Sequence, residues 1–400
     1  MLASALHDSV GRRMSRIWDA IVVGAGPGGA IASYALARRG ASVLLLDRHA
    51  FPRWKVCGAC LSAGALERLA NAGLGDLARS ESAVALRQLT LIAGRRRAIV
   101  PLRGSAALSR VRFDQALVDA AISEGVEFRS RTRAALGPLA GDARIVHVEI
   151  EGSEEEHTGS VVIDATGLGR GLEVRSTDPS PERLRPTWRV AEHSRVGIGA
   201  TIDDAEYDLV AGDLRMVVGR TGYVGLVRLE DGRLNVGAAV DPTALRGRSP
   251  ADAVADILAD ASLPPLEGDV VHGWRGTPAL TRGRTDMGAE RLFRLGDAAG
   301  YVEPFTGEGM CWALGAGLAV TELALEARRG WRPDLLRVWD SHQRKSMARS
   351  QRLCRVVAWA LRRPRVVDSV VGLLNKAPLL AKPFVRQAAG APRSRLGRAA

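Results

Sequence analysis

The stretch DAIVVGAGPGGAIASYALARRGASVLLLD, from Asp19 to Asp47, decides the fold. It indicates a short apolar strand, a glycine-rich loop, a helix that stops at Gly40 and a second buried strand. This order forms a βαβ unit, because two parallel strands need a crossover that is usually a helix. The sequence therefore predicts a Rossmann-type domain near the start of the chain.

The loop GAGPGG has the spacing G-x-G-x-x-G, which is typical of dinucleotide binding when it follows a strand and opens a helix. In this pattern Gly24 permits a tight turn, Gly26 lets the backbone approach a pyrophosphate, and Gly29 allows close helix packing. The helix N-terminus adds N–H donors that favour phosphate charge. We therefore assign five loop residues to the cofactor: Gly24, Gly26, Pro27, Gly28 and Gly29.

Asp47 ends the second strand eighteen residues (47 minus 29) after Gly29. A carboxylate there can accept a hydrogen bond from the 2′-hydroxyl of an adenosine ribose, and it disfavours a 2′-phosphate. Asp47 and the adjacent Arg48 are therefore predicted cofactor contacts. NAD and FAD both carry this ribose, so these residues leave both cofactors open.

A second glycine-rich segment, GDAAGYVEPFTGEGM from Gly296 to Met310, separates the two cofactors. Asp297 follows an apolar strand, where its carboxylate can bind the ribityl chain that FAD has and NAD lacks. Gly307 and Gly309 let the backbone approach a flat ring, and a helix that starts near Met310 directs its positive end at that ring. The pattern favours FAD, with contacts predicted at Gly296, Asp297, Pro304, Gly307, Glu308, Gly309 and Met310.

Alternating strands interrupt the βαβ pattern. The segment ALRQLTLIAGRRRAIVPL and the region 196–240 alternate apolar and polar residues between turns, which indicates antiparallel hairpins. We therefore expect an α/β fold with an α+β insertion: a Rossmann-type FAD-binding domain, an inserted antiparallel-sheet substrate domain and a helical C-terminal tail. The expected boundaries are 18–84, 106–180 and 286–340 for the first domain, 85–105 and 181–285 for the second, and 341–400 for the tail.

The charge of the protein is concentrated in that tail. The 400 residues carry a net charge of +12, and residues 341–400 hold fourteen Lys and Arg against the single acid Asp368. On a helix, residues 345–365 form an apolar stripe flanked by arginines. This stripe is typical of a helix on an anionic membrane surface or an acidic carrier protein, and also of a helix packed on its own protein. Nucleic acid is not expected as a partner, because no recognised binding module accompanies the charge.

No segment has the pattern of a secretory signal or the ~20 apolar residues of a spanning helix. We therefore expect a cytoplasmic protein that contacts the inner face of the membrane peripherally. The four cysteines are too few for a disulfide framework. Cys57 and Cys60 form C-x-x-C without a second pair at zinc-binding distance, so no metal site is expected.

Five motifs occur in the order found in one flavoprotein family: GAGPGG with Asp47, DRHAFPRWKVCGACLS, LSRVRFDQAL, VVIDATG and GDAAGYVEPFTGEGM. The chain resembles the para-hydroxybenzoate hydroxylase fold, and most closely its geranylgeranyl reductase-like branch, over residues 18–341. The resemblance implies that Arg110 binds the pyrophosphate or ribityl region of FAD. It places Asp164 and Gly167 of IDATG near the pyrophosphate and a transient nicotinamide donor.

The resemblance also implies two candidate catalytic residues. Cys57 lies in PRWKVCG, near the flavin in reductase-like relatives, and is a candidate proton donor or substrate contact; a small buried apolar side chain is the alternative. Tyr223 matches the first residue of the Tyr-x-Trp-x-Phe-Pro substrate motif of these reductases. The motif's Trp, Phe and Pro are missing, and Gly225 in place of the Trp predicts a roomier pocket.

These features predict an FAD-dependent oxidoreductase that reduces a carbon–carbon double bond of an apolar lipid, isoprenoid or polyketide. The alternative is a flavin monooxygenase that hydroxylates an aromatic or polyketide substrate, and a flavoprotein without catalytic activity is a third hypothesis. Only one dinucleotide fingerprint is present, so NAD(P)H or another reductant would bind transiently as electron donor.

Overall fold

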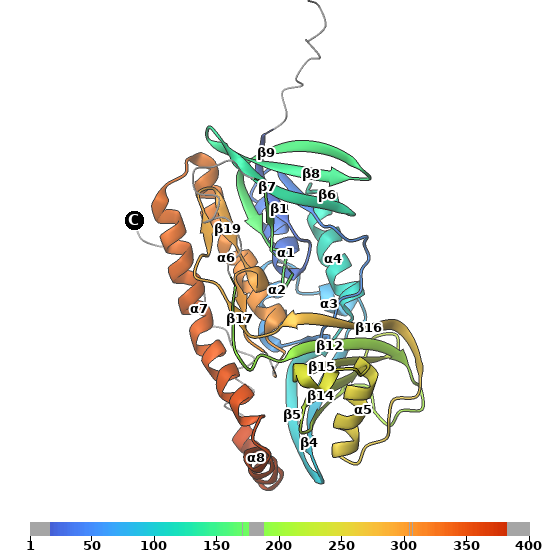
Figure 1. Ribbon diagram of the computed structural model, residues 1–400. Coiled ribbons are helices and arrows are strands. Elements are labelled where there is room, and N and C mark those ends of the chain that lie inside the picture. The colour runs from blue at the N-terminus through green and yellow to red at the C-terminus, as the bar shows by residue number, and fades with distance from the viewer. Residues whose placement is uncertain (1–16, 170, 176–187, 304, 306, 382–400) are drawn as a thin grey trace, which may run out of the picture.

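The first glycine loop belongs to a nine-stranded mixed sheet. The computed structural model describes residues 17–169, 171–175, 188–303, 305 and 307–381 (Figure 1). Its parallel strands are β1 (Ile17–Val23), β2 (Val43–Leu46), β6 (Glu127–Arg129), β9 (Ser153–Asp164) and β19 (Leu292–Arg294). Strands β7 (Thr132–Ala140), β8 (Ala143–Ile150), β10 (Glu173–Val174) and β18 (Gly288–Ala289) extend it.

Three helices cover one face of this sheet: α1 (Pro27–Ala37), α4 (Arg110–Ser123) and α6 (Gly309–Arg329). Strand residues such as Val22 and Val43 and helix residues such as Phe113 and Leu314 form one buried apolar cluster. Helices α1 and α6 lie very close together, because a Cβ on Gly317 would stand 2.3 Å from the carbonyl oxygen of Gly28. This packing fixes the N-terminus of α6 beside the first glycine loop.

Helix α6 differs from the expectation that no segment is apolar enough to span a membrane. By length and composition it can cross a membrane, but 61% of its most apolar window is buried inside the protein. That burial is typical of a core helix. A helix buried in a protein core can be as long and apolar as one that spans a membrane.

The second sheet has eight strands in the order β16-β12-β15-β14-β13-β4-β5-β3. All pairs are antiparallel except β13 with β4, because the hairpin β4–β5 enters from a distant part of the chain. Helix α5 (Pro250–Asp260), which begins with a capping box of Ser249 and Asp252, packs on one face of this sheet. The strand bounds are β3 (Cys60–Leu61), β4 (Val84–Ala93), β5 (Arg96–Ala107), β12 (Val196–Asp203), β13 (Asp213–Val218), β14 (Gly222–Arg228), β15 (Leu234–Val240) and β16 (Asp269–Ala279).

The C-terminal region is helical, as the sequence predicts. Helix α7 (Pro333–Ala360) runs along both domains, and α8 (Pro364–Lys376) packs against β4 and β5 (Figure 1). The buried Trp339 anchors α7, because its indole N–H donates to the Arg294 carbonyl at 2.9 Å. The other elements are α2 (Ala63–Asn71), α3 (Leu77–Ser80), β11 (Arg189–Val190), β17 (Arg282–Gly283), β20 (Gly300–Tyr301), η2 (Pro242–Leu245), η3 (Gly296–Ala298) and η4 (Pro378–Ala381).

Candidate functional site

The sequence motifs meet at one edge of the nine-stranded sheet. Val23 of β1 pairs with Leu46 of β2 and Asp164 of β9, and Asp164 pairs with Arg294 of β19. Because these strands are parallel, the loops that follow them lie together at their carboxyl ends. The glycine loop, Asp47, the IDATG segment and the second glycine-rich segment therefore surround one space.

Glycine is required at each of the three fingerprint positions for a different structural reason. Gly24 has φ +106°, and a Cβ there would lie 2.3 Å from the Ala165 carbonyl oxygen. A Cβ on Gly29 would lie 1.9 Å from the Gly24 carbonyl oxygen, so this glycine closes the turn, and Gly28 makes the close contact with α6. Gly26 faces open space near Arg53 and would allow a ligand to reach its backbone.

The carboxylate of Asp47 is buried against this loop. One oxygen accepts the Ala25 N–H and the other accepts the His49 N–H, both at 2.9 Å. A carboxylate has about four acceptor positions, so Asp47 keeps capacity for a ribose hydroxyl. The neighbouring Arg48 is exposed and lies near Gly169, at the rim of the site.

Arg110 is held by a partner that the sequence analysis missed. It forms two 2.7 Å hydrogen bonds with the completely buried Asp114, which also pairs with Arg53 at 3.1 Å. Burial opposes the charge of Arg110, but Asp114 outweighs it and raises the pKa of the guanidinium. Both guanidinium groups point at Gly26, since its added Cβ would lie 3.6 Å from Arg53 and 3.9 Å from Arg110. The arrangement presents positive charge where a pyrophosphate would meet the loop.

Asp297 lies opposite these cations in the first turn of η3, after the left-handed Gly296 at φ +58°. No hydrogen bond joins its largely buried carboxylate to another described residue. Burial raises the pKa of Asp297, while Lys55, Arg110 and Arg282 oppose that change. Burial and the nearby Arg110 in turn lower the pKa of Lys55. The Asp297 carboxylate is therefore a buried acceptor available to hydroxyl groups.

Asp164 has partners within the protein, and its place near the pyrophosphate stays a prediction. Its carboxylate is fully buried, accepts the Thr166 hydroxyl at 2.6 Å and lies 3.6 Å from Arg294, so it shapes the loop. At Gly167, with φ +78°, an added Cβ would lie 3.2 Å from the Lys55 amine. The backbone at Gly167 therefore lies beside Lys55, at the edge of the site.

The second glycine-rich segment forms the opposite wall. An added Cβ on Gly307 would lie 3.7 Å from Cβ of Cys60, and one on Gly309 would lie 3.1 Å from the Tyr301 hydroxyl. Helix α6 begins at Gly309, as predicted, and Met310 is buried in its first turn. Pro304 lies outside the described residues.

Glu308 does not present its carboxylate to this space. The side chain is 2% exposed and accepts the Ser350 hydroxyl of α7 at 2.5 Å, with the Cys354 sulfur at 3.9 Å. Burial raises the pKa of Glu308, although these two bonds oppose it. This side chain joins the glycine-rich segment to α7, and a cofactor contact of Glu308 stays a prediction.

Both candidate catalytic residues lie near Tyr301, whose pKa they influence. The Cys57 side chain lies near Arg110, and the Cys57 carbonyl accepts the Asn235 amide at 2.9 Å. Tyr223 is buried on β14, with its ring 4.9 Å from Phe305. Burial raises the pKa of Tyr301 well above its ordinary value, and Asp297, Cys57 and Tyr223 add to this.

The extra room predicted beside Gly225 is absent. A Cβ on Gly225 would lie 2.9 Å from the Met216 sulfur, so the neighbouring strand fills the place of the missing indole. Methionine adapts readily to such gaps.

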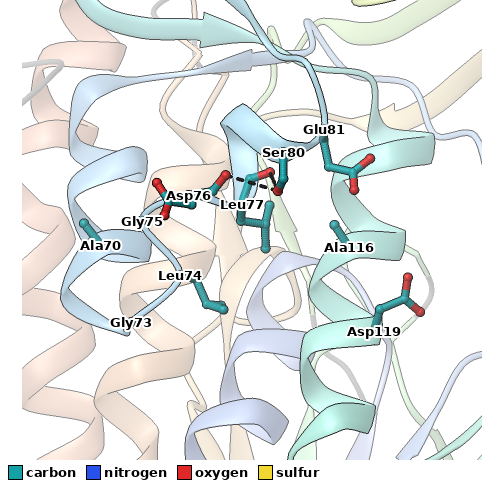
Figure 2. A pocket seen from close by; sticks show the side chains of 10 residues that line it. All are labelled: Ala70, Gly73, Leu74, Gly75, Asp76, Leu77, Ser80, Glu81, Ala116 and Asp119. Atoms are coloured by element: carbon teal, nitrogen blue, oxygen red, sulfur yellow. Dashed lines mark hydrogen bonds between the residues drawn. The ribbon is translucent and has the colours of Figure 1, made fainter.

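Two hollows accompany these features. One, of about 540 Å³, lies between the α2–α3 region and α4 (Figure 2), is lined in part by Asp76, Glu81 and Asp119, and contains none of the predicted site residues. The other, of about 100 Å³, lies between the two domains and includes Lys55 and Arg110 of the site. The smaller hollow is therefore the one that adjoins the predicted chemistry.

Comparison with known proteins agrees with this geometry. Residues 18–163 match the FAD binding domain family. The chain is 30% identical over 327 residues to digeranylgeranylglycerophospholipid reductase 2 of Methanopyrus kandleri, covering 78% of this chain and 77% of the relative. The chain belongs to the geranylgeranyl reductase-like family. It is thus an FAD-dependent oxidoreductase, as its motifs predict.

Other relatives of this geranylgeranyl reductase-like protein extend the picture. Menaquinone reductase of Mycobacterium tuberculosis is 26% identical over 391 residues, covering 92% of this chain and 90% of the relative. A p-nitrophenol 4-monooxygenase of Pseudomonas putida superposes with a TM-score of 0.76 at 16% identity, covering 95% and 100% of the two chains. The second likeness confirms the fold predicted from the motifs.

The site fits FAD on three structural observations. Because Gly26 has no side chain, a ligand can approach its backbone beside Arg53 and Arg110. Asp297 offers a buried acceptor. Helix α6 directs its N-terminus at the same space. These are the groups that a pyrophosphate, a ribityl chain and a reduced ring require.

Several site residues escaped the sequence analysis: Arg53, Lys55, Asp114, Arg282 and Tyr301. A local signal existed only for some of them. Arg110 and Asp114 have the i,i+4 spacing of a helix ion pair, and Arg53 and Lys55 lie inside PRWKVCG. Arg282 and Tyr301 meet only because β17 pairs with β20.

Proposed function

We propose that this FAD-dependent oxidoreductase reduces a carbon–carbon double bond in an apolar substrate that carries an isoprenoid chain. The two relatives named above support an isoprenoid, because digeranylgeranylglycerophospholipids and menaquinones both contain such chains. When bound, FAD supplies the hydride that such a reduction needs.

The observation that carries the proposal is the apolar wall beside the glycine-rich segment. Tyr223, Phe305 and Tyr301 belong to one apolar cluster that also includes Met216 and Leu280. Apolar side chains beside the glycine-rich segment favour a hydrocarbon over a polar substrate.

The chain's own residues can hold the proton that completes the reduction. Burial, reinforced by Glu303, raises the pKa of Tyr223 well above its ordinary value, although Arg195 opposes this. Tyr223 and Tyr301 therefore stay protonated at neutral pH. Cys57, near Arg110, is the third proton-bearing group beside this space.

A nicotinamide dinucleotide is the proposed electron donor. The hollow between the domains contains Lys55, Arg110, Arg112 and Arg233 against Glu230 and Asp231. Of these four cations, Lys55 alone forms no ion pair with a described residue, and its charge favours an anionic donor.

A single-turnover experiment tests the proposal. The FAD-loaded protein is reduced under nitrogen and mixed with a geranylgeranyl lipid in detergent, while the flavin absorbance is recorded. We expect oxidised flavin to return only when the lipid is present. Return with oxygen alone, and never with the lipid, would contradict the proposal and favour the hydroxylating alternative.

We also propose that the protein works in the cytoplasm at the membrane surface, where such lipids are found. Fractionation of cells tests this, with recovery in a salt-extractable membrane fraction as the expected result.

A further inference from the structure

The last turns of α7, together with α8 and η4, expose large apolar side chains. Leu379 is 65% exposed, Val356 61% and Trp359 53%. We call this region the C-terminal surface and define its apolar part by six residues: Val356, Trp359, Val370, Leu373, Leu379 and Leu380. Exposed apolar residues that gather in one region mark an interaction site.

Unpaired cations lie among these apolar residues. Arg352, Arg355, Arg363, Arg365 and Lys376 are exposed, and none forms an ion pair with a described residue. The Arg363 guanidinium lies 3.8 Å from the centre of the Trp359 ring, which keeps an aromatic and a cation together. Asp368 is the single acid of this part of the chain, so the C-terminal surface is strongly positive.

The inner side of the same helices reaches the proposed substrate wall. Val367, Val371 and Leu361 belong to the apolar cluster that contains Tyr223 and Phe305. Arg96 of β5 lies over α8 at Gly372, where an added Cβ would stand 2.6 Å from its guanidinium. The inner apolar side chains of α7 and α8 therefore pack directly with the residues around Tyr223.

The positive charge of the C-terminal surface indicates which kind of partner binds there. Residues 382–400 contain five Lys and Arg and no acid, so they add positive charge and do not neutralise it. The occupant must be anionic and must also accept exposed leucine and tryptophan side chains. A bilayer with anionic lipids has both properties, whereas an acidic protein surface offers mainly the charge.

We propose that the C-terminal surface lies on an anionic bilayer and that the apolar substrate reaches Tyr223 from this side of the molecule. The second part rests on the proposed function. The first part stands without it, because it follows from exposure and charge alone.

Flotation with vesicles tests the docking surface. The full-length FAD-loaded protein is mixed with vesicles of phosphatidylcholine, with or without 30% phosphatidylglycerol. We expect flotation only with the anionic lipid. The triple variant Arg355→Glu/Arg363→Glu/Arg365→Glu should lower the partition coefficient at least a hundredfold, since each cation contributes roughly fivefold.

A matched control carries the same charge change elsewhere. Arg133→Glu/Arg246→Glu/Arg329→Glu alters three exposed arginines that form no ion pair with described residues and lie on other elements. It should lose at most a small part of the binding. Equal losses in both triple variants, or equal flotation with neutral vesicles, would overturn the assignment. The assignment would also be overturned if the wild-type protein did not float with anionic vesicles but bound an acidic carrier protein.

A second variant tests the apolar part without changing charge. Leu373→Gln/Leu379→Gln should weaken flotation at least tenfold and leave the melting temperature unchanged, because both side chains are exposed. Unchanged flotation would overturn the apolar contribution.

Turnover separates this inference from the proposed function. The arginine triple variant should reduce a detergent-dissolved lipid at the wild-type rate and lose reduction of the same lipid in vesicles. Equal vesicle turnover in wild type and variant would overturn delivery from this side. If neither protein reduces any lipid while the wild type still floats, the proposed function fails and the docking surface stands.

Discussion

Arg110 forms two 2.7 Å hydrogen bonds with the completely buried carboxylate of Asp114, one helical turn away. The same carboxylate pairs with Arg53, so one acid fixes both cations that face Gly26. Replacing Asp114 with Asn removes the counter-charge of the buried Arg110 and leaves Arg53 with only Asp47, at 3.6 Å. We expect the free energy of unfolding to fall by about 3–5 kcal/mol, measured by urea denaturation of the apoprotein.

The matched control for that change is Asp119→Asn on the same helix, where the carboxylate is exposed. It should change the free energy of unfolding by less than about 0.5 kcal/mol. Similar effects of the two substitutions would show that Asp114 has no special role.

Gly26 and Gly29 should respond to alanine in opposite ways. At Gly26 the added methyl group has room, because its nearest neighbours lie 3.6 Å and 3.9 Å away, but it enters the space assigned to the pyrophosphate. Gly26→Ala should keep the stability within about 0.5 kcal/mol and weaken FAD binding about tenfold or more. At Gly29 the methyl group would collide with a carbonyl oxygen at 1.9 Å, so Gly29→Ala should destabilise the apoprotein by several kcal/mol.

Fluorescence titration of apoprotein with FAD and thermal unfolding measure these two effects separately. If Gly26→Ala bound FAD as tightly as the wild type, the assignment of the glycine loop to the cofactor would be wrong.

Cys57 and Cys60 provide a comparison within one motif. Cys57 lies near Arg110, whereas the Cys60 thiol donates to the Gly58 carbonyl at 3.1 Å and burial raises its pKa to about 12. Cys57→Ala should slow lipid-dependent oxidation of the reduced protein about a hundredfold, the usual scale for loss of a proton donor, without slowing reduction by the donor.

Stopped-flow absorbance records both half-reactions. Cys60→Ala should leave both rates close to wild type. If Cys57→Ala also leaves both rates unaltered, Cys57 is a packing residue, and the proton must come from Tyr301 or Tyr223.

Glu308 predicts a pH dependence of stability. Because burial raises its pKa above the ordinary value of 4.5, the folded protein binds this proton more tightly than the unfolded chain. The resulting stabilisation is complete below about pH 4.5 and is lost as the pH rises through the folded-state pKa. Glu308→Gln cannot ionise, so its apoprotein should gain melting temperature relative to wild type as the pH rises from 4 to 8.

Glu206→Gln, at an exposed position that forms no ion pair with a described residue, should not alter the pH profile. Parallel melting curves for Glu308→Gln and wild type across this range would contradict the buried-carboxylate account.

The sequence could predict which loops meet, because the carboxyl ends of parallel strands share one edge. Gly24, Asp47 and Asp297 each follow an apolar strand, and this local order was enough to place them together. It was also enough to predict the α/β fold and FAD, which the family comparison confirms. The domain boundaries stay predictions.

Side-chain direction could not be read in the same way. Glu308 lies in the glycine-rich segment but bonds to Ser350, 42 residues later in the chain, and Met216 fills the space beside Gly225 from a neighbouring strand. Both outcomes depend on packing between distant residues, for which a single sequence carries no periodic signal. The same reason explains why Arg282 and Tyr301 were missed.

The most direct test of the central claim is the mass of the product formed from a geranylgeranyl lipid. The FAD-loaded protein, its electron donor and the lipid are incubated under nitrogen and in air, and the lipid is analysed by mass spectrometry. We predict a gain of two hydrogen atoms for each double bond reduced, under both atmospheres and only with FAD present. A gain of one oxygen atom, formed only in air, would contradict the assignment of the protein as a reductase.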